Sequence, residues 1–292
     1  MNITVTGSLG NISQPLVRIL VDAGHQVTVI SSSPDRVSAI EATGAKAAIG
    51  SINDVAFLTG AFTGADVVYT MVPPDFSVPD FRAYIRETGQ NYAAAIKAAG
   101  VTRIVNLSSI GAHLPGGTGP IAGLHDVEGI LDGLEGISVK HLRPGFFYVN
   151  FFTNIDMIKH MNIIGANYGP ADDMVLVHPA DIAAAAAEEI QQPFTTASSM
   201  RYVASDERNT REIATVLGTA IGKPELQWIA FTDEDALNGM TSAGLPEPIA
   251  KAYVEMGTAV RSGKLWEDYT THKQQLSARK LEQFATEFAA RY

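Results

Sequence analysis

The chain begins with a short apolar stretch that leads directly into a glycine-containing loop. Residues 3–5 are Ile, Thr and Val, residues 7–10 read Gly-Ser-Leu-Gly, and a helical pattern of apolar residues starts at Pro15. This order predicts a strand, a tight turn and a helix N-terminus, an arrangement that receives the phosphates of a dinucleotide on backbone N–H groups. Two glycines three residues apart also occur in ordinary β–α turns. The rest of the chain has to decide between the two interpretations.

Strand and helix patterns alternate through the first half of the chain. After the first strand, further strands are predicted at residues 26–30, 45–49, 66–72, 101–107 and 137–142, and helices at 14–23, 36–43, 55–62, 79–99 and from 125 onward. Such alternation is typical of βαβ units, whose right-handed crossovers bring the loops after the strands to one edge of a parallel sheet. We therefore expect an α/β fold with a doubly wound parallel Rossmann sheet over residues 1–150.

The regular alternation ends near Asn150. Residues 151–292 are therefore expected to form a smaller, mainly helical C-terminal lobe on the substrate side. Residues 153–170 are expected to form a loop with short helical pieces, while helices are predicted at 181–192, 210–221, 249–260 and 277–290. The segment 200–204 is expected to rejoin the main sheet, and 226–231 to form a strand in the outer lobe.

Composition excludes several classes of function. The 292 residues are 46% hydrophobic and 18% charged, which suits a globular core. The formal net charge of −10 and the lack of a basic stripe disfavour nucleic-acid binding. The absence of cysteine excludes disulfides and thiol catalysis, and no spacing of His, Asp and Glu suggests a metal site. No apolar run reaches the ~20 residues of a membrane span and no signal-like segment precedes the first strand, so we expect a soluble cytoplasmic protein.

The end of the second strand indicates which nicotinamide cofactor fits. An NAD site usually places Asp or Glu there to hold the ribose 2′-hydroxyl, whereas an NADP site uses hydroxyls and an Arg on the 2′-phosphate. Ser31, Ser32 and Arg36 match the second pattern. Asp35 is counter-evidence, although it follows Pro34 and can cap the next helix instead. NADP(H) is therefore favoured over NAD(H).

Two further strand ends carry distinctive residues. The fourth strand closes on Met71, Val72, Pro73 and Pro74, and the fifth delivers Ser108 and Ser109. A diproline at the carboxyl edge of a parallel sheet makes a stiff apolar wall where ligands bind. Its alternative role is simply to terminate the strand.

An ordered set of short motifs resembles the NmrA-like branch of the atypical short-chain dehydrogenases. These motifs are residues 7–10, 71–74, 107–111, 127–128 and 142–147, followed by 177–183, 244–246 and 284–288. They extend over nearly the whole chain. The resemblance implies a Rossmann domain that binds NAD(P)(H) and a smaller C-terminal lobe that closes the substrate side.

The resemblance also implies which residues contact the dinucleotide. The phosphate loop would be Gly7, Ser8, Leu9, Gly10, Asn11 and Ile12. The adenosine ribose would face Ser31, Ser32 and Arg36, and the nicotinamide ribose would lie near Met71, Val72, Pro73 and Pro74. The nicotinamide would lie beside Ser108 and Ser109, in a frame formed by Pro144, Gly145, Phe146 and Phe147.

The Tyr-x-x-x-Lys pair of conventional short-chain dehydrogenases is missing. Aligned on Glu128, the Tyr position is Pro120 and the Lys position is Leu124, and neither side chain can move a proton. His125 and Ser108 are the candidate catalytic residues, since a histidine with the ordinary pKa near 6.5 can serve as a proton donor. His113 is a second histidine near the same edge. The alternative for His125 is a structural role at the helix start.

An aromatic stretch follows the sixth strand. It supplies the candidate substrate contacts Phe147, Tyr148 and Phe151, which could stack a flat ring or form a hydrophobic hinge between the lobes. One hypothesis is an oxidoreductase that transfers hydride to a small electron-poor substrate such as a quinone, which requires little proton machinery. The other is a non-catalytic NAD(P) redox sensor that acts through a protein partner. A homodimer is a further open alternative.

Overall fold

A parallel sheet forms the centre of the first lobe. The computed structural model describes all of residues 1–292. Seven strands follow the order β10-β6-β5-β4-β1-β2-β3, and all their pairings are parallel. Their bounds are β1 Asn2–Val5, β2 Gln26–Ser31, β3 Lys46–Ile49, β4 Val67–Thr70, β5 Arg103–Leu107, β6 Ser138–Pro144 and β10 Ser198–Val203. This order confirms the expected doubly wound α/β fold.

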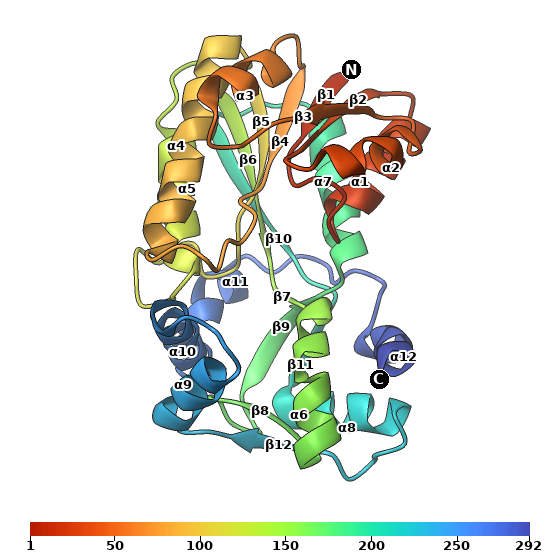
Figure 1. Cartoon of the computed structure of the whole chain (residues 1–292), viewed down its shortest axis with the longest axis vertical. Helices are drawn as coiled ribbons and strands as arrows, with labels where there is room; N and C mark the ends of the chain where they lie inside the picture. Colours follow the sequence, from red (N-terminus) through yellow and green to blue (C-terminus); the bar gives the residue numbers. More distant parts are fainter.

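Helices cover both faces of this sheet (Figure 1). One face carries α1 (Ser13–Asp22), η1 (Pro34–Arg36), α2 (Val37–Glu41) and α7 (Pro179–Gln191), and the other carries α3 (Val55–Phe62), α4 (Phe81–Ala99) and α5 (Ile121–Asp132). Each face has its own apolar core. Buried alanines of α7, such as Ala183 and Ala186, have short side chains that let this helix pack closely against α1.

Local sequence explains where the helices begin and end. The carboxylate of Asp54 accepts a hydrogen bond from Phe57 N at 3.0 Å, and Asp80 accepts one from Ala83 N at 2.9 Å, so α3 and α4 both begin on capped N-termini. The long helix α4 ends at Gly100, whose φ of +69° is the left-handed conformation that glycine adopts readily. These signals account for the agreement between the predicted and observed positions of α3 and α4.

The second lobe is mainly helical and contains two small sheets. Strands β7 (Phe146–Phe147), β9 (Asp173–Val177) and β11 (Asp206–Asn209) form one sheet, while β8 (Ile163–Ala166) and β12 (Gln227–Ala230) form the other. The helices are η2 (Tyr148–Asn154), α6 (Ile155–Met161), α8 (Thr210–Ala220), α9 (Asp233–Ser242), α10 (Glu247–Arg261), η3 (Lys264–Trp266), α11 (Glu267–Thr271) and α12 (Leu281–Arg291). Over residues 153–170 the short helix α6 agrees with the expected helical pieces, whereas the strand β8 was not expected.

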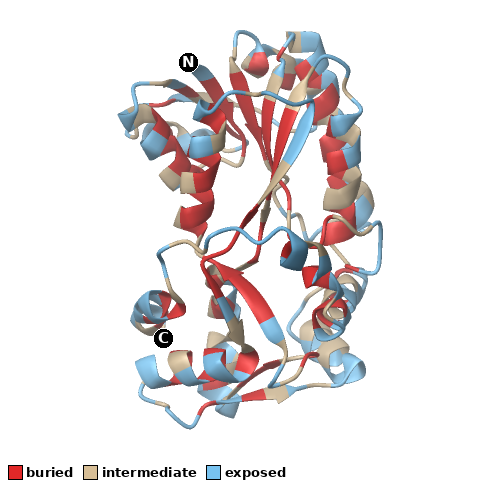
Figure 2. Ribbon diagram, turned by 180° about the vertical axis from the view of Figure 1, so that it is seen from behind, coloured by how far each residue is buried: buried red, intermediate tan, exposed pale blue.

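The chain passes between the lobes more than once. It leaves the first lobe after β6, builds β7 to β9, and returns with α7 and β10 before entering the second lobe again. Strand β10 pairs with β6 over Ser198–Val203, at the edge of the main sheet. Buried residues run through both lobes and across the region where they meet (Figure 2). No helix has the length and apolarity needed to cross a membrane.

The loop between β5 and α5 takes part in the core of the second lobe. Ile110 and Ala112 of this loop are buried in the same apolar cluster as Leu265 and Trp266 of η3. The loop therefore belongs to both lobes, since it starts at the sheet edge and packs into the second lobe. This placement brings residues 108–120 between the main sheet and η3.

Candidate functional site

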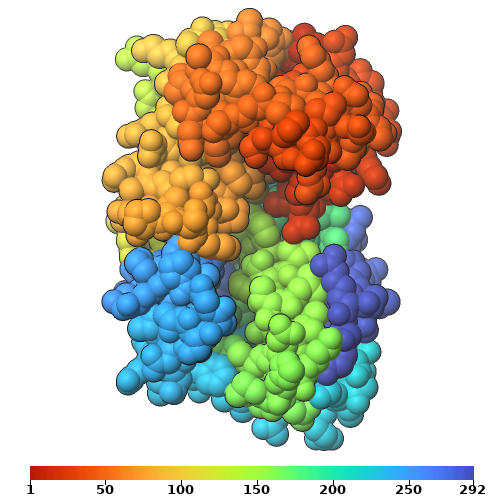
Figure 3. Space-filling view, viewed as in Figure 1, coloured from red at the N-terminus to blue at the C-terminus, as the bar shows by residue number.

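The candidate site lies at the carboxyl edge of the main sheet, which faces the second lobe. Strand β1 has β2 on one side and β4 on the other, so the loops after β1 and β4 lead away in opposite directions. Such a switch point is where open α/β sheets bind ligands. The surface is hollowed where the red and orange segments of the first lobe meet the green segment of the second (Figure 3). The predicted cofactor-binding residues of the loops after β1 and β4 come together here.

The loop after β1 has the geometry of a phosphate cradle. A Cβ atom on Gly7 would lie 2.8 Å from the side chain of Met71, and its φ of +89° also requires glycine. The backbone N–H groups of Leu9, Asn11 and Ile12 have no hydrogen-bond acceptor in the chain. No side chain caps the N-terminus of α1 either. Unpaired amides at the positive end of a helix form an anion-binding site.

The end of β2 is joined to this loop by hydroxyl groups. Ser8 Oγ donates to Ser31 Oγ at 3.1 Å, and Ser31 Oγ accepts a hydrogen bond from Ser33 N at 3.3 Å. Ser32 and Arg36 are exposed, and Arg36 makes no ion pair. An unpaired guanidinium a few residues from two hydroxyls is the combination that NADP sites use for the 2′-phosphate.

The wall after β4 is fixed through its backbone. Met71 N donates to Thr6 Oγ1 at 2.9 Å, and Tyr92 OH donates to Met71 O at 2.8 Å. Tyr84 OH donates to Pro73 O at 2.9 Å. Val72 and Pro74 continue the same segment. The sequence prediction missed the supporting roles of Thr6 and Tyr92, because Tyr92 fits the helical spacing of α4 and no pattern marks its hydroxyl.

The ends of β5 and β6 are joined to each other. Ser108 N donates to Leu142 O at 2.8 Å, and Ile110 N donates to Pro144 O at 2.9 Å. The hydroxyl of Ser108 is buried and has no partner, whereas Ser109 Oγ donates to Ile110 O at 2.9 Å. A Cβ atom on Gly145 would collide with Val175 O, so only glycine fits there. Ser108 thus presents an unpaired polar atom at the sheet edge.

The predicted aromatic substrate contacts occupy two different environments. Phe146 and Phe147 are half-buried, while Tyr148 and Phe151 are buried in the core of the second lobe. The ring of Tyr148 stacks on Phe284 with 5.2 Å between centroids. This packing gives Tyr148 and Phe151 a structural role, and their contact with a substrate stays a prediction.

His125 lies further inside its helix than the sequence suggested. We expected the helix to start at His125, but α5 already begins at Ile121 after the glycine-rich segment. The Nδ1 atom of His125 lies 2.8 Å from Ala112 O, within hydrogen-bonding distance. One ring nitrogen of His125 therefore holds the β5–α5 loop. Its predicted catalytic role stays a prediction.

Arg143, the residue before Pro144, is the centre of a buried ionic cluster. Arg143 donates to both carboxylate oxygens of Glu128 on α5, at 3.0 and 2.7 Å. It also donates to Asp268 of α11 at 3.0 Å and to Tyr202 OH of β10 at 3.2 Å. This cluster joins α5, β6, β10 and α11 at the residue that precedes the segment 144–147.

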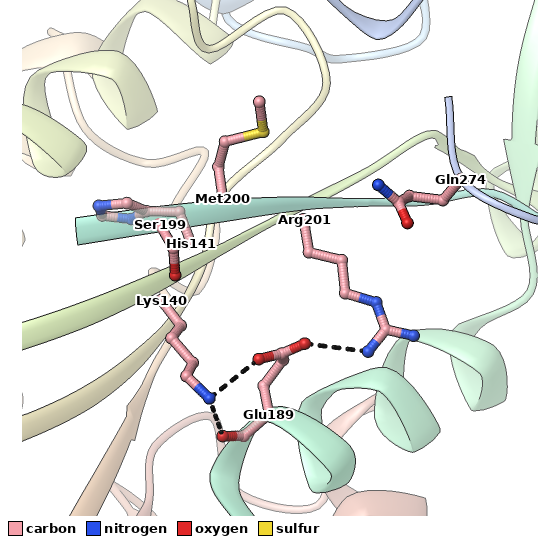
Figure 4. Close-up of a pocket in the computed structure, with 7 residues that line it drawn as sticks. All are labelled: Lys140, His141, Glu189, Ser199, Met200, Arg201 and Gln274. Carbon is pink, nitrogen blue, oxygen red and sulfur yellow. Dashed lines mark hydrogen bonds and ion pairs between the residues drawn. The ribbon is translucent and has the colours of Figure 1, made fainter. Parts of the chain in front are cut away.

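A hollow of about 280 Å³ lies elsewhere, beside the edge strand β10. Its charged residues neutralise one another (Figure 4). Lys140 Nζ lies 3.1 Å from one carboxylate oxygen of Glu189, and Arg201 lies 3.0 Å from the other. Lys140 Nζ also donates to Glu189 O at 2.9 Å, near the end of α7. These contacts pair the charges that line the hollow and stabilise the end of α7, so the hollow offers no unpaired charge to a ligand.

Comparison with known proteins identifies the family. The sequence model of the NmrA-like family matches residues 1–281. The chain belongs to the NmrA-like family. Among curated proteins, the NAD(P)H azoreductase of Xenophilus azovorans is 27% identical over 258 residues, which is 87% of this chain and 85% of that protein.

Solved structures share the fold over almost the full length. The NADPH-dependent quinone oxidoreductase of Escherichia coli in complex with NADPH superposes with a TM-score of 0.83 at 22% identity, covering 98% of this chain and 99% of that one. The triphenylmethane reductase of Citrobacter sp. superposes with a TM-score of 0.80 at 20% identity, covering 99% and 100%. At these identities the likeness establishes the fold.

Proposed function

We propose that this protein is an NAD(P)H-dependent oxidoreductase that reduces a small electron-poor substrate, such as a quinone, by direct hydride transfer. The observation that carries the proposal is the set of unpaired amides of Leu9, Asn11 and Ile12 at the uncapped start of α1. They lie at the switch point of a doubly wound sheet, where a pyrophosphate binds in this fold. The names of the azoreductase and the quinone oxidoreductase support the same class of reaction.

The residues at the sheet edge fit a dinucleotide along its whole length. The loop from Gly7 to Ile12 would hold the pyrophosphate. Ser31, Ser32 and Arg36 would hold the adenosine ribose and its 2′-phosphate, which favours NADP(H) over NAD(H). The wall Met71–Pro74 would line the nicotinamide ribose, and the segment Pro144–Phe146 would frame the ring. In this assignment the first lobe, with β10 in its sheet, binds the cofactor and the second covers the substrate.

The bound nicotinamide would supply a hydride to the acceptor. The chain's own residues position both molecules and exclude water. Ser108 has a buried, unpaired hydroxyl that can hold the nicotinamide amide or the acceptor. Phe146 and Phe147 are half-buried and can contact a flat acceptor ring. A quinone needs no strong acid from the protein, which agrees with Pro120 and Leu124 at the positions of the usual Tyr and Lys.

The proposal is tested by anaerobic mixing of the protein with NADPH or NADH and a panel of quinones and dyes. Acceptor-dependent loss of absorbance at the nicotinamide band, with NADPH preferred, is the expected result. Tight NADPH binding without turnover of any acceptor would contradict the proposed oxidoreductase activity. That outcome, together with a cofactor-dependent protein partner, would instead favour a redox sensor.

A further inference from the structure

The loop between β5 and α5 and the segment packed against it carry polar groups that the protein does not satisfy. Both ring nitrogens of His113 are buried and unpartnered, and so is Thr118 Oγ1. On the other segment, the indole Nε1 of Trp266 in η3 is also buried without a partner. Buried polar groups are satisfied in most proteins, so these exceptions call for a ligand or ordered water.

This loop adjoins the candidate site. It starts at Ser108 and Ser109, and its residue Ile110 donates to Pro144 O at 2.9 Å, at the start of the segment expected to frame the nicotinamide. A Cβ atom on Gly111 would collide with Leu265 of η3, so the loop and η3 are in direct contact. The unpartnered groups therefore lie between the sheet edge and the second lobe.

Hydrogen bonds fix the backbone around His113, but its ring makes none. His125 Nδ1 lies 2.8 Å from Ala112 O and so fixes the backbone next to His113. Turn hydrogen bonds from Ala112 N to Ser109 O at 3.1 Å and from Leu114 N to Gly111 O at 3.1 Å hold the loop on both sides. The backbone on both sides of His113 is thus fixed, while neither ring nitrogen has a hydrogen-bond partner in the chain.

Burial favours the neutral form of this ring. Burial lowers the pKa of His113 below its usual value of 6.5. Arg143 of β6 also lowers this pKa, whereas the carboxylates of Asp268, Glu267 and Glu128 raise it without outweighing the burial. A neutral imidazole has one N–H donor and one acceptor nitrogen, and the indole of Trp266 can only donate.

We propose that His113 binds an oxygen atom of the electron acceptor through its ring N–H donor. Because the N–H group of a neutral imidazole needs an acceptor atom, the substrate class is one that bears a carbonyl-type oxygen, as quinones do. His113 positions and polarises this oxygen as a neutral donor and transfers no proton. The inference rests on the proposed function, since it names a substrate contact of that same site.

The test replaces His113 with Phe, which keeps the ring shape and removes both nitrogens. Because these nitrogens have no partner in the protein, His113→Phe should retain or raise the melting temperature. It should lower kcat/KM for menadione about tenfold or more, the size of one lost hydrogen bond. The affinity for NADPH should not change. The matched control is His160→Phe on the exposed surface of α6, which should alter none of these values.

A second electron acceptor, one without oxygen, shows whether His113→Phe removes a contact to oxygen or lowers activity in general. Crystal violet accepts hydride at a cationic carbon and has no oxygen, so His113→Phe should reduce it as the wild type does. His113→Gln, which keeps an N–H donor, should recover part of the menadione activity. If wild type does not reduce crystal violet, binding of menadione to the NADP⁺ complex, followed by tryptophan fluorescence, gives the comparison without turnover.

The outcomes distinguish this inference from the proposed function. Wild-type turnover of menadione with an unchanged kcat/KM in His113→Phe would overturn the inference alone, and would assign an ordered water to the unpartnered nitrogens. NADPH binding with no turnover of any acceptor would overturn the proposed function. Failure of menadione to bind the wild-type NADP⁺ complex would overturn the inference as well. If His113→Phe does not fold, His113→Leu, which also removes both nitrogens, makes the same comparison.

Discussion

Glu128 and Arg143 meet through two parallel hydrogen bonds of 3.0 and 2.7 Å inside the first lobe. Their side chains are only 8% and 12% exposed, so the pair is largely shielded from water. A second carboxylate, from Asp268 of the second lobe, lies 3.0 Å from the same guanidinium. The cluster therefore joins the two lobes next to Pro144, where the predicted nicotinamide frame begins.

Replacing Arg143 with Met should destabilise the protein strongly. The change leaves Glu128 and Asp268 without their cation, and breaking a buried ion pair from one side costs about 3–5 kcal/mol. Urea denaturation measures this loss. The double variant Glu128→Gln with Arg143→Met should recover part of it, and equal stability of the single and double variants would argue against the pairing. The control is Lys251→Ala in the exposed pair with Glu247, which should cost less than about 0.5 kcal/mol.

Replacing Gly7 with Ala should damage cofactor binding and stability together. The added methyl group would lie 2.8 Å from Met71 and would force a φ of +89° on a residue that disfavours it. We expect a loss of about 1–3 kcal/mol in the free energy of unfolding and at least about tenfold weaker NADPH binding by fluorescence titration. Gly60→Ala is the matched control. Gly60 has open space around its Cβ position in α3, so that change should stabilise the protein by about 0.5–1 kcal/mol.

Replacing Arg36 with Ala should change cofactor preference without changing the fold. Arg36 is exposed and unpaired, so its removal should leave the melting temperature as it is. Loss of a charge-assisted bond to the 2′-phosphate should weaken NADPH binding about 10- to 100-fold and leave NADH binding unchanged. Calorimetric titration with both cofactors measures the ratio. Arg211→Ala on the exposed face of α8 is the control, and an equal effect there would indicate nonspecific electrostatics.

Acid should destabilise the protein through His113. Burial lowers the pKa of His113 in the folded state below 6.5, so the unfolded chain binds the proton more readily. This contribution to stability is complete above pH 6.5 and declines as the pH falls from there toward the folded-state pKa. Urea denaturation between about pH 5 and 7.5 should show a smaller decline for His113→Phe than for wild type. If the free energy of unfolding depends on pH in the same way in both proteins, the lowered pKa of His113 is contradicted.

The sequence predicted the elements whose ends carry strong local signals. Helix α3 begins at Val55 after the cap residue Asp54, and α4 ends where Gly100 adopts a left-handed conformation. In contrast, β11 has the sequence Asp-Glu-Arg-Asn, which has no strand periodicity. It forms a strand because it pairs with β9 in the folded second lobe. Pairing between distant segments leaves no such signal in a single sequence.

The candidate site was predictable in its backbone and less so in its side chains. The loop at Gly7 and the segment Met71–Pro74 were found because glycine and proline restrict the backbone directly. The choice between His125 and His113 depended on burial and on hydrogen-bond partners. In the structure, one ring nitrogen of His125 contacts Ala112 O, and both ring nitrogens of His113 are unpaired. Sequence spacing contains no information on either property.

The late return of β10 to the main sheet constrains how a nascent chain can fold. Until Val203 has been synthesised, β6 is an edge strand with unpaired backbone groups, even though the loop after β1 left the ribosome long before. The segment from Phe146 to Val177 must also be placed outside the sheet before α7 can cross back. The main sheet and the second lobe therefore complete their folding together, and a fragment that ends near residue 150 would expose the side of β6 that β10 normally covers.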